Sequence, residues 1–339
     1  MECKEILKEL IKFDTYKDKQ NKEIMDYIQS ILEYKDFKVD YRSKCLVMSI
    51  KTNSNLAFIG HTDTVQAGND WTYNPLVLTE EDDKLYGLGT CDMKGGIAAI
   101  IKAVLDIDWK QLRYGIKLIF TYDEEIGFEG IKEINKINIQ IPENVIIGEP
   151  TNNIIKNGSK GLLEFKFCFE GKSAHSSNPS KGINAIDNCL EFLNKLKNSY
   201  NDLKLETDDR FKIPYTTMNI GKIEGGKSIN IVPNECVTYV DFRVISNEHR
   251  NRIIKYINEL NSIYNFDYET INDIKPFIND NKKCITTNGI TEASLIEAKN
   301  RNILGVGPVN PHEANEYITI DSLNKLVEQY KEIILKTCN

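Results

Sequence analysis

Apolar runs of strand length alternate with segments of helical periodicity through the first half of the chain. Three such runs lie at 56–60, 115–122 and 144–148, and the segments 96–106 and 128–136 separate them. Strands that are apolar along their whole length have both faces buried, and strands joined through helices run parallel. The pattern therefore predicts an α/β fold in which a mostly parallel sheet carries helices on both faces.

Residues with the chemistry of metal ligands stand where each of these strands ends. His61 and Asp63 follow the first strand. Glu124 and Glu125 follow the second strand, and Glu149 follows the third. The carboxyl ends of parallel strands meet at one edge of a sheet, so we expect these side chains to lie together. Each acid taken singly is explained as well by a helix cap or an ion pair.

Two further candidate ligands favour a metal site over helix caps and ion pairs. Asp92 occupies the glycine-rich turn 87–96, just before a helical run, and His312 lies in the loop 307–316 near the C-terminus. The chain has only four histidines, so a chance match of two of them to a metal site is less expected. Zinc accepts imidazole and carboxylate ligands. The combination therefore favours a metal site over a set of unrelated caps and ion pairs.

The order of elements changes after Gly158. Strand, helix, strand, strand, helix and strand follow, which is the order of a ferredoxin-like α+β domain. We expect these elements at 162–169, 184–197, 216–223, 236–243, 248–263 and 267–271. From about 274 the first pattern resumes, with a helix at 292–299, a strand at 302–306 and a helix at 320–336. The sequence predicts a discontinuous domain of residues 1–159 and 274–339, interrupted by an inserted domain of residues 160–273.

Composition narrows the classes of function. The 339 residues include 43 basic and 50 acidic side chains, a net charge of −7, without a basic block, which argues against nucleic-acid binding. No window approaches the apolar length of a membrane span, and the N-terminus lacks the apolar core of a signal peptide. The eight cysteines are scattered, as is typical of reduced thiols. We expect a cytoplasmic protein that acts on a small molecule and binds neither membrane nor nucleic acid.

The histidines and strand-end acids, in this order, resemble the M20 family of zinc-dependent amidohydrolases and peptidases over nearly the whole chain. Thr291-Glu292-Ala293 and the His-x-x-Asn-Glu motif at 312–316 look closest to acetylornithine deacetylase and succinyl-diaminopimelate desuccinylase. The resemblance implies a zinc-peptidase-like catalytic domain and an inserted domain through which two chains form a homodimer. It also implies two bound Zn²⁺ ions, with Co²⁺ or Mn²⁺ as alternatives.

The resemblance also assigns roles around the metals. It implies that one metal is held by His61 and Glu149, the other by Glu125 and His312, and that Asp92 bridges them. Asp63 would orient His61, because a metal-bound imidazole usually gives its second N–H to a carboxylate. Glu124 would be the general base that takes a proton from a metal-bridging water and delivers it to the leaving amine.

Four more residues match family positions near the substrate. His175, within 171–179, would polarise the scissile carbonyl from the partner chain of the dimer. Asn230 and Arg243 would contact the substrate, and Arg243 suits a bidentate grip on a carboxylate. Glu292 pairs with a substrate ammonium in one interpretation and is an acid favoured by a helix N-terminus in the other. His249, which has no such context, is predicted to be a surface residue.

The expected function is hydrolysis of the amide bond of an N-acyl amino acid, with deacetylation of N2-acetylornithine in arginine biosynthesis as the first choice. Lys160 stands near positions where desuccinylases carry arginines, which favours a neutral acyl group. Enzymatic alternatives are desuccinylation of N-succinyl-diaminopimelate and cleavage of peptides by a dipeptidase or carboxypeptidase. A non-catalytic M20-like binding protein is the alternative from another class, and the intact Glu124-Glu125 pair argues against it.

Overall fold

The computed structural model describes residues 1–264, 266–279, 285–287 and 289–339. Its contacts divide the chain into two compact units. Unit 1 combines residues 1–157 with residues 291–339, and unit 2 contains residues 158–290. Unit 2 thus lies, in sequence, between the two segments of unit 1. Among the described residues, no helix combines the length and the apolar character needed to cross a membrane.

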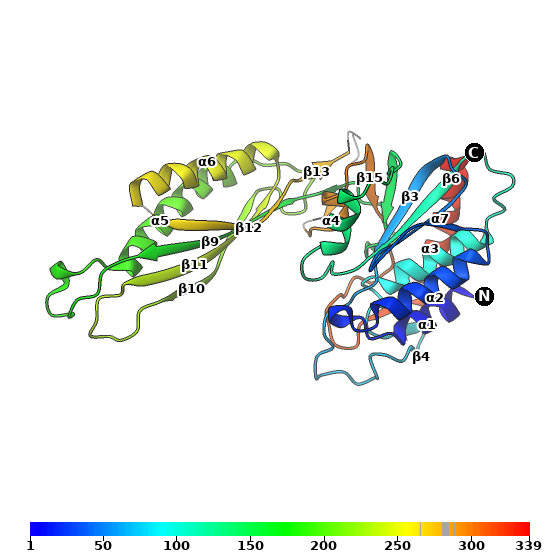
Figure 1. Ribbon diagram of the computed structural model, residues 1–339, viewed down its shortest axis with the longest axis horizontal. Helices are drawn as coiled ribbons and strands as arrows, with labels where there is room; N and C mark the ends of the chain where they lie inside the picture. Colours follow the sequence, from blue (N-terminus) through cyan, green and yellow to red (C-terminus); the bar gives the residue numbers. More distant parts are fainter. Residues whose placement is uncertain (265, 280–284, 288) are drawn as a thin grey trace. The chain divides into compact units, whose positions relative to one another are not determined.

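Unit 1 is built on a six-stranded sheet of order β1-β2-β6-β3-β7-β15 (Figure 1). The strands are β1 (Lys38–Arg42), β2 (Leu46–Ile50), β3 (Ser54–His61), β6 (Gly115–Thr121), β7 (Asn144–Ile147) and β15 (Asn300–Ile303). The four strands from β6 to β15 run parallel, whereas β1 and β2 pair antiparallel at one edge. The expected α/β fold with a mostly parallel sheet is confirmed.

One face of this sheet packs against the main helical core. The helices are α1 (Cys3–Ile11), α2 (Asn21–Glu33), α3 (Lys94–Asp106) and α7 (Ile320–Cys338). Alternate strand residues such as Phe58 and Leu118 point into this core, in which α3 contacts both α1 and α7. The next residues along the strands, such as Ile59 and Ile119, are also buried. The turn η3 (Glu292–Ser294) contacts β7 and β15, and α4 (Glu129–Lys136) buries its own Ile131 and Ile134, so side chains on both faces of the sheet are buried.

A small antiparallel sheet positions two loops of unit 1. It has the order β16-β5-β4 and consists of β4 (Thr79–Glu81), β5 (Lys84–Tyr86) and β16 (Tyr317–Thr319). Tyr317 pairs with Tyr86, so the segment that follows β5 lies beside the segment that precedes β16. These segments contain Asp92 and His312, respectively. A single turn η1 (Tyr16–Asp18) connects α1 to α2.

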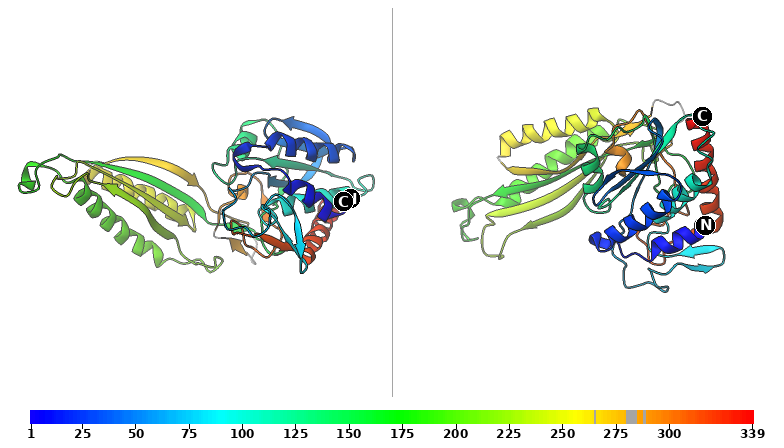
Figure 2. Two further views of the ribbon diagram at one scale, coloured as in Figure 1. Left: turned by 90° about the horizontal axis from the view of Figure 1, so that it is seen from below. Right: turned by 45° about the vertical axis from the view of Figure 1, so that its right-hand side comes forward.

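Unit 2 has the ferredoxin-like topology expected from the element order. Its antiparallel sheet has the order β10-β11-β9-β12, and helices lie along one face (Figure 2). The elements are β9 (Gly161–Glu170), η2 (Pro179–Lys181), α5 (Ala185–Lys204), β10 (Thr217–Gly225), β11 (Glu235–Val244), α6 (Asn247–Tyr264) and β12 (Asp267–Ile274). Its core is rich in phenylalanine, and Phe167, Phe192 and Phe266 form close ring contacts.

The limits of unit 2 differ from the expected inserted domain of residues 160–273, mainly at the second end. The strand β8 (Gly158–Ser159) pairs with β13 (Phe277–Ile278) and with β14 (Thr286–Thr287). This small sheet places both later strands in unit 2. Strands of two residues lack an apolar run long enough to be seen in the sequence, so the pattern ends the domain too early.

The predicted helix at 292–299 was wrong, and the predicted strand at 302–306 begins earlier, at Asn300. The structure has only the single turn η3 at this position. The Arg301 guanidinium donates to the carbonyl oxygens of Ala293 and Ile296, at 3.2 Å in both cases. A longer helix would use these carbonyls internally. The arginine therefore takes over helix acceptors and ends the turn.

Gly96 gives a test of the packing between α3 and the sheet. A Cβ atom on Gly96 would lie 2.2 Å from the carbonyl oxygen of Gly148. Replacing glycine by alanine inside an exposed helix stabilises it by about 1 kcal/mol. We expect Gly96→Ala instead to lower the free energy of unfolding by about 1–3 kcal/mol, because backbone must move. Thermal unfolding measures the change.

Gly68→Ala is the control, since a Cβ at Gly68 has nothing within 4 Å. Its effect should stay within about 0.5 kcal/mol. A Gly96→Ala variant as stable as the wild type would contradict the close packing of α3 on the end of β7.

Candidate metal centre

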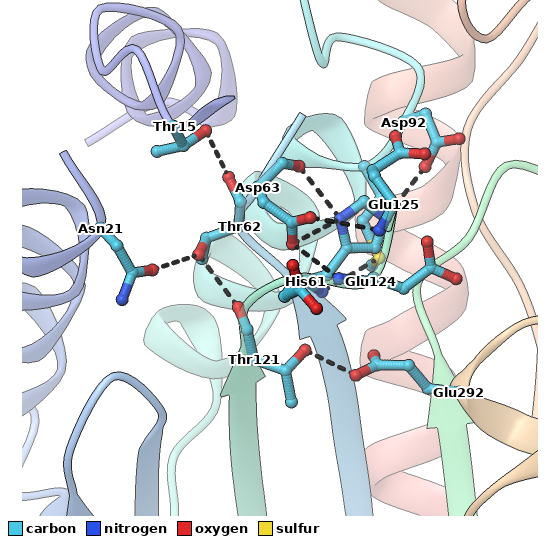
Figure 3. Close-up of polar contacts among 12 residues, drawn as sticks. Thr15, Asn21, His61, Thr62, Asp63, Asp92, Thr121, Glu124, Glu125 and Glu292 are labelled. Atoms are coloured by element: carbon cyan, nitrogen blue, oxygen red, sulfur yellow. Dashed lines mark hydrogen bonds and ion pairs between the residues drawn. The ribbon is translucent and has the colours of Figure 1, made fainter. Parts of the chain in front are cut away.

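The ends of three parallel strands in unit 1 bring the predicted metal ligands together (Figure 3). His61 is the last residue of β3, and its register partner Thr121 is the last residue of β6. Glu124 and Glu125 follow β6, and Glu149 follows β7. Because these ends are aligned, side chains that are far apart in the sequence converge at one edge of the sheet.

Asp92 lies between two pairs made of one imidazole and one carboxylate. The Nε2 atom of His61 is 3.1 Å from Asp92 Oδ1 and 3.5 Å from Glu149 Oε1. The Nε2 atom of His312 is 2.9 Å from Glu125 Oε2 and 3.8 Å from Asp92 Oδ2. Asp92 therefore directs one oxygen to each histidine. This is the arrangement that a carboxylate shared by two cations requires.

Two overlapping groups of side chains have the geometry to hold a metal ion. One group consists of His61, Asp92 and Glu125, and the other of His61, Glu124 and Glu149. In each group the potential ligand atoms lie within 4.8 Å of one another. Imidazole and carboxylate together suit zinc and other divalent transition metals. The donor set therefore fits such an ion.

Burial and neighbouring negative charges raise the pKa values of two acids of the centre, Glu124 and Glu149. Burial raises the pKa of Glu124 well above its ordinary value; nearby His61 opposes the shift, and the charges of Asp92 and Glu125 add to it. Burial likewise raises the pKa of Glu149, and Asp92 is the largest of the charges that add to this rise. Like charges this close favour protonation unless a positive charge is present.

Asp63 contacts both the His61 ring and the loop after β6. The Nδ1 atom of His61 lies 3.0 Å from the backbone oxygen of Asp63 and 3.5 Å from its carboxylate. The same carboxylate accepts the backbone N–H groups of Glu124 and Glu125, each at 3.2 Å. Burial acts to raise the pKa of Asp63, but the bonds from His61 and these amides outweigh it and lower the pKa. Asp63 thus fixes the loop after β6 to the loop after β3.

Met93 explains the glycines that precede His61 and Glu149. A Cβ atom would lie 2.8 Å from Met93 Cε at Gly60 and 2.6 Å from it at Gly148. The thioether therefore occupies the space between the ends of β3 and β7. The backbone N–H of His61 also lies 3.4 Å from the Met93 sulfur. Both strands can pass the methionine only without a side chain at these positions.

Hydrogen bonds connect the N-terminal segment of the chain to Thr62, which follows His61, and to Lys94, at the start of α3. Lys94 is fully buried, and its ammonium donates to the carbonyl oxygen of Phe13 at 2.8 Å. Burial lowers the pKa of Lys94 to about 7. The Thr15 hydroxyl donates to the Thr62 carbonyl oxygen at 2.7 Å, and Asn21 contacts the Thr62 hydroxyl (Figure 3). The segment before α2 thus supports the loop that carries His61.

Glu292 lies beneath the centre, at the end of β6 (Figure 3). It is 1% exposed, and the Thr121 hydroxyl donates to its Oε1 at 2.6 Å. Among the described residues Oε2 has no hydrogen-bond partner. Burial raises the pKa of Glu292 to about 7. Its N-terminal neighbour Thr291 caps η3 by accepting the backbone N–H of Ala293.

Sequence reasoning missed Glu316 as a structural part of the centre. Its carboxylate is 2% exposed and accepts the backbone N–H groups of Gly89, Cys91 and Asp92. The sequence offered one signal, because Glu316 belongs to the His-x-x-Asn-Glu motif that carried the resemblance. Its partners are backbone amides of a distant turn, and no residue pattern reveals such a pairing.

Unit 2 holds the other three predicted site residues, and it brings two of them together. His175 forms an isolated antiparallel bridge with Ile231, and the Ser176 amide donates to the Asn230 carbonyl oxygen at 3.1 Å. His175 and Asn230 are both exposed. Arg243 lies at the opposite end of β11, where it forms an ion pair with Asp241 at 3.1 Å.

The packing of unit 2 corrects one expectation, for His249, and shows where Lys160 lies. His249 is 3% exposed, so its prediction as a surface residue was wrong. Its ring nitrogens lie 2.8 Å from the Thr216 hydroxyl and 3.1 Å from Glu206 Oε2, partners that precede β10 in the sequence. Lys160 is 1% exposed and donates to the Tyr215 carbonyl oxygen at 2.7 Å. The Lys160 ammonium is therefore buried and hydrogen-bonded within unit 2.

Comparisons with known proteins identify the family. A family model described as a peptidase dimerisation domain matches residues 157–268. A probable succinyl-diaminopimelate desuccinylase from Staphylococcus aureus (strain MRSA252) is 33% identical, over 91% of this chain and 91% of that protein. The chain belongs to the M20 family. An acetylornithine deacetylase from Myxococcus xanthus is also 33% identical, over 73% of this chain and 68% of that protein.

Solved M20 structures share the fold. The M20 metallo-carboxypeptidase Sso-CP2 from Sulfolobus solfataricus superposes with a TM-score of 0.80 at 20% identity, covering 98% of both chains. The aminopeptidase PepT from Bacillus cereus gives a TM-score of 0.80 at 20% identity, covering 99% of this chain and 98% of that chain. The M20 relatives are named as deacetylases, desuccinylases and peptidases, so this chain is a hydrolase.

Lys160 gives a pH test of burial in unit 2. Burial lowers its pKa from the ordinary 10.5 to about 8. Between these values the unfolded chain keeps the proton and the folded chain loses it, so folding is favoured as the pH rises. Relative to Lys160→Met, the wild-type free energy of unfolding should therefore increase by about 1–3 kcal/mol from pH 8 to pH 10.5. Urea unfolding at both pH values measures it.

Lys197→Met, which removes an exposed lysine from α5, is the control and should give no such pH dependence. A wild-type protein whose stability relative to Lys160→Met falls or stays constant over this range would contradict the burial of the Lys160 ammonium.

Proposed function

We propose that this M20 hydrolase cleaves the amide bond of an N-acyl amino acid, and that N2-acetylornithine is its first candidate substrate. One observation carries the proposal: Asp92 directs an oxygen to each of two imidazole–carboxylate pairs, with the buried Glu124 beside them. The names of the curated relatives favour deacylation. They support the class of reaction, whereas the choice of acetylornithine is our own.

The proposed ligands divide between two metal ions. His61 and Glu149 would hold one ion, Glu125 and His312 the other, and Asp92 would contact both. An M20 relative of known structure, from Bacillus subtilis, is described as a dinuclear metal-binding peptidase. We propose Zn²⁺, with Co²⁺ or Mn²⁺ as alternatives. When bound, two such ions would lower the pKa of water and polarise the scissile carbonyl.

Glu124 is proposed as the general base. Its neighbour Glu125 lies 2.9 Å from His312 and completes one of the imidazole–carboxylate pairs. Glu124 also lies within ligand distance of His61 and Glu149, and we assign it to proton transfer at this position beside the ligands. The Glu124 carboxylate would take a proton from the attacking water and return it to the amine that leaves. The Asp63 carboxylate accepts the backbone N–H groups of both glutamates. It thereby fixes the backbone that carries Glu124, the proposed base, and Glu125, the proposed ligand.

Substitution of Glu124 tests whether this residue is a general base or a metal ligand. If Glu124 is the base, Glu124→Gln should keep both metal ions and its substrate affinity while turnover falls by about 10²–10⁴. Elemental analysis and steady-state kinetics give the two readouts. The control is Glu313→Gln, the same change at an exposed glutamate in the His312 loop. Loss of a metal ion from Glu124→Gln, with turnover restored by added zinc, would show that Glu124 is a ligand.

The acyl group is proposed to be neutral. The Lys160 ammonium is enclosed in unit 2 and bonded to a backbone carbonyl, so it is not available to bind the second carboxylate of a succinyl group. Glu292 stays a prediction as the partner of a substrate ammonium. Its burial adds a condition, because the turn that carries Glu292 must open before a substrate can reach it.

A substrate panel tests the proposed function and its alternatives. The purified protein with zinc should release acetate from N2-acetylornithine, and treatment with a chelator should abolish this activity reversibly. Faster release of succinate from N-succinyl-diaminopimelate, or cleavage of dipeptides alone, would select one of the enzymatic alternatives. If the protein binds zinc but hydrolyses none of these substrates, the remaining hypothesis is a non-catalytic binding protein. Cytoplasmic location and a role in arginine biosynthesis stay predictions.

Unit 2 is proposed to join two chains in a homodimer. The matching family model describes this part of the chain as a dimerisation domain. The strand β10 lies at an edge of the sheet and is largely exposed. Leu190, Ile223 and Ile229 are 48%, 48% and 101% exposed, and such apolar side chains next to a free sheet edge favour association. We further propose that His175 acts at the metal centre of the partner chain.

Mixing two inactive variants tests whether His175 acts across the dimer. His175→Ala and Glu124→Gln should each be nearly inactive alone. After both are unfolded and refolded together, one site of each heterodimer has an intact histidine and an intact base. Random pairing should then restore about a quarter of all sites. Heterodimers, demonstrated by two affinity tags, that are no more active than their parents would show that His175 serves its own chain.

A further inference from the structure

The Glu316 carboxylate is held by three backbone amides of one turn. Its Oε1 accepts the N–H groups of Cys91 at 2.6 Å and of Asp92 at 2.9 Å. Its Oε2 accepts the N–H group of Gly89 at 3.0 Å. Both oxygens are therefore used by the protein itself. Glu316 has the charge of a metal ligand, but its oxygens are committed to the turn that carries Asp92.

The backbone of this turn is shaped to receive an anion. Successive N–H groups that converge in a turn form a concavity that binds negative charge. Gly89 adopts a φ of +84°, a conformation that favours glycine. A Cβ atom there would also lie 3.0 Å from Thr64 and 3.1 Å from the buried stem of Lys94. The turn thus has the form of an anion site, and the Glu316 carboxylate occupies it.

Further contacts join the same turn to the His312 loop. The Gly87 amide donates to the backbone oxygen of Glu316 at 3.1 Å. The Cys91 thiol donates to the Pro308 carbonyl oxygen at 3.4 Å. The Tyr317 amide donates to the Asn310 side chain at 3.3 Å, a bond that connects the two ends of the loop to each other. Pro308 and Asn310 precede His312, and Glu316 follows it. The loop is therefore fixed to the Asp92 turn on both sides of the histidine.

We propose that Glu316 is a positioning residue that fixes Asp92 and His312 relative to each other and thereby sets the metal affinity of the centre. This inference rests on the proposed function, in which both residues are ligands. Asp92 is the residue whose oxygens face both histidines, so a displaced Asp92 would weaken both ion sites. Residues that orient metal ligands in this way typically change metal affinity by about 10- to 100-fold when substituted.

The variant Glu316→Gln keeps the size of the side chain and removes its charge. One of its ends is an NH₂ group, which would face a backbone N–H as donor against donor. We expect its affinity for Zn²⁺ to be about 10- to 100-fold weaker than that of the wild type. Competition between the metal-free proteins and a chromophoric chelator measures this without any substrate. Glu313→Gln, the same change at an exposed position of the same loop, should bind Zn²⁺ like the wild type.

The outcomes separate the inference from the function on which it rests. A wild-type protein that binds none of Zn²⁺, Co²⁺ and Mn²⁺ would overturn the proposed function and this inference with it. A wild-type protein that binds Zn²⁺ together with a Glu316→Gln variant of equal affinity would overturn the positioning role alone. The same holds if Glu316→Gln lowers only the melting temperature of the metal-free protein, as a merely structural residue would.

A shorter acid covers the case in which Glu316→Gln does not fold. Glu316→Asp keeps the charge but cannot reach all three amides, so we expect Zn²⁺ binding about 10-fold weaker than in the wild type. Far-ultraviolet circular dichroism establishes that this variant is folded. Wild-type Zn²⁺ affinity in folded Glu316→Asp would overturn the inference.

Discussion

Negative charge concentrated at the ends of three parallel strands is the constraint on which the rest of unit 1 depends. Five acids of the centre fall into two kinds. Asp63 and Glu316 give their oxygens to backbone amides, which hold the loops in place. Asp92, Glu125 and Glu149 instead face imidazole rings. The first kind is stabilised by hydrogen bonds within the fold, and the second kind forms the proposed cation site.

The fold class followed from the sequence because it rests on long periodic segments. The apolar strands β3, β6 and β7 and the helix α3 lie where the pattern predicted them, since burial on both faces dictates their composition. The grouping of the site residues could be predicted from the sequence for a related reason. Parallel strands bring residues after their ends together, so His61, Glu125 and Glu149 were expected as neighbours, and they lie close in the structure. The roles assigned to them stay predictions.

Three of the misses depend on side-chain contacts that the local residue pattern does not indicate. Arg301 ends the turn at η3 by binding its carbonyl oxygens, although the segment has helical composition. Residues that precede β10 enclose His249, which has a polar local context. Glu316 binds the amides of a turn more than two hundred residues earlier in the chain. Side-chain patterns cannot report such partners.

The division of unit 1 into two segments has a consequence for synthesis on the ribosome. All of unit 2 is made before residues 291–339, which supply β15, α7 and His312 to unit 1. Until then the β7 edge of the sheet lacks its partner strand, and the core lacks the helix that packs against α3. Domains generally fold as units while the chain emerges. The nascent chain therefore completes its second unit first, and the proposed set of metal ligands is complete only after His312 has been added.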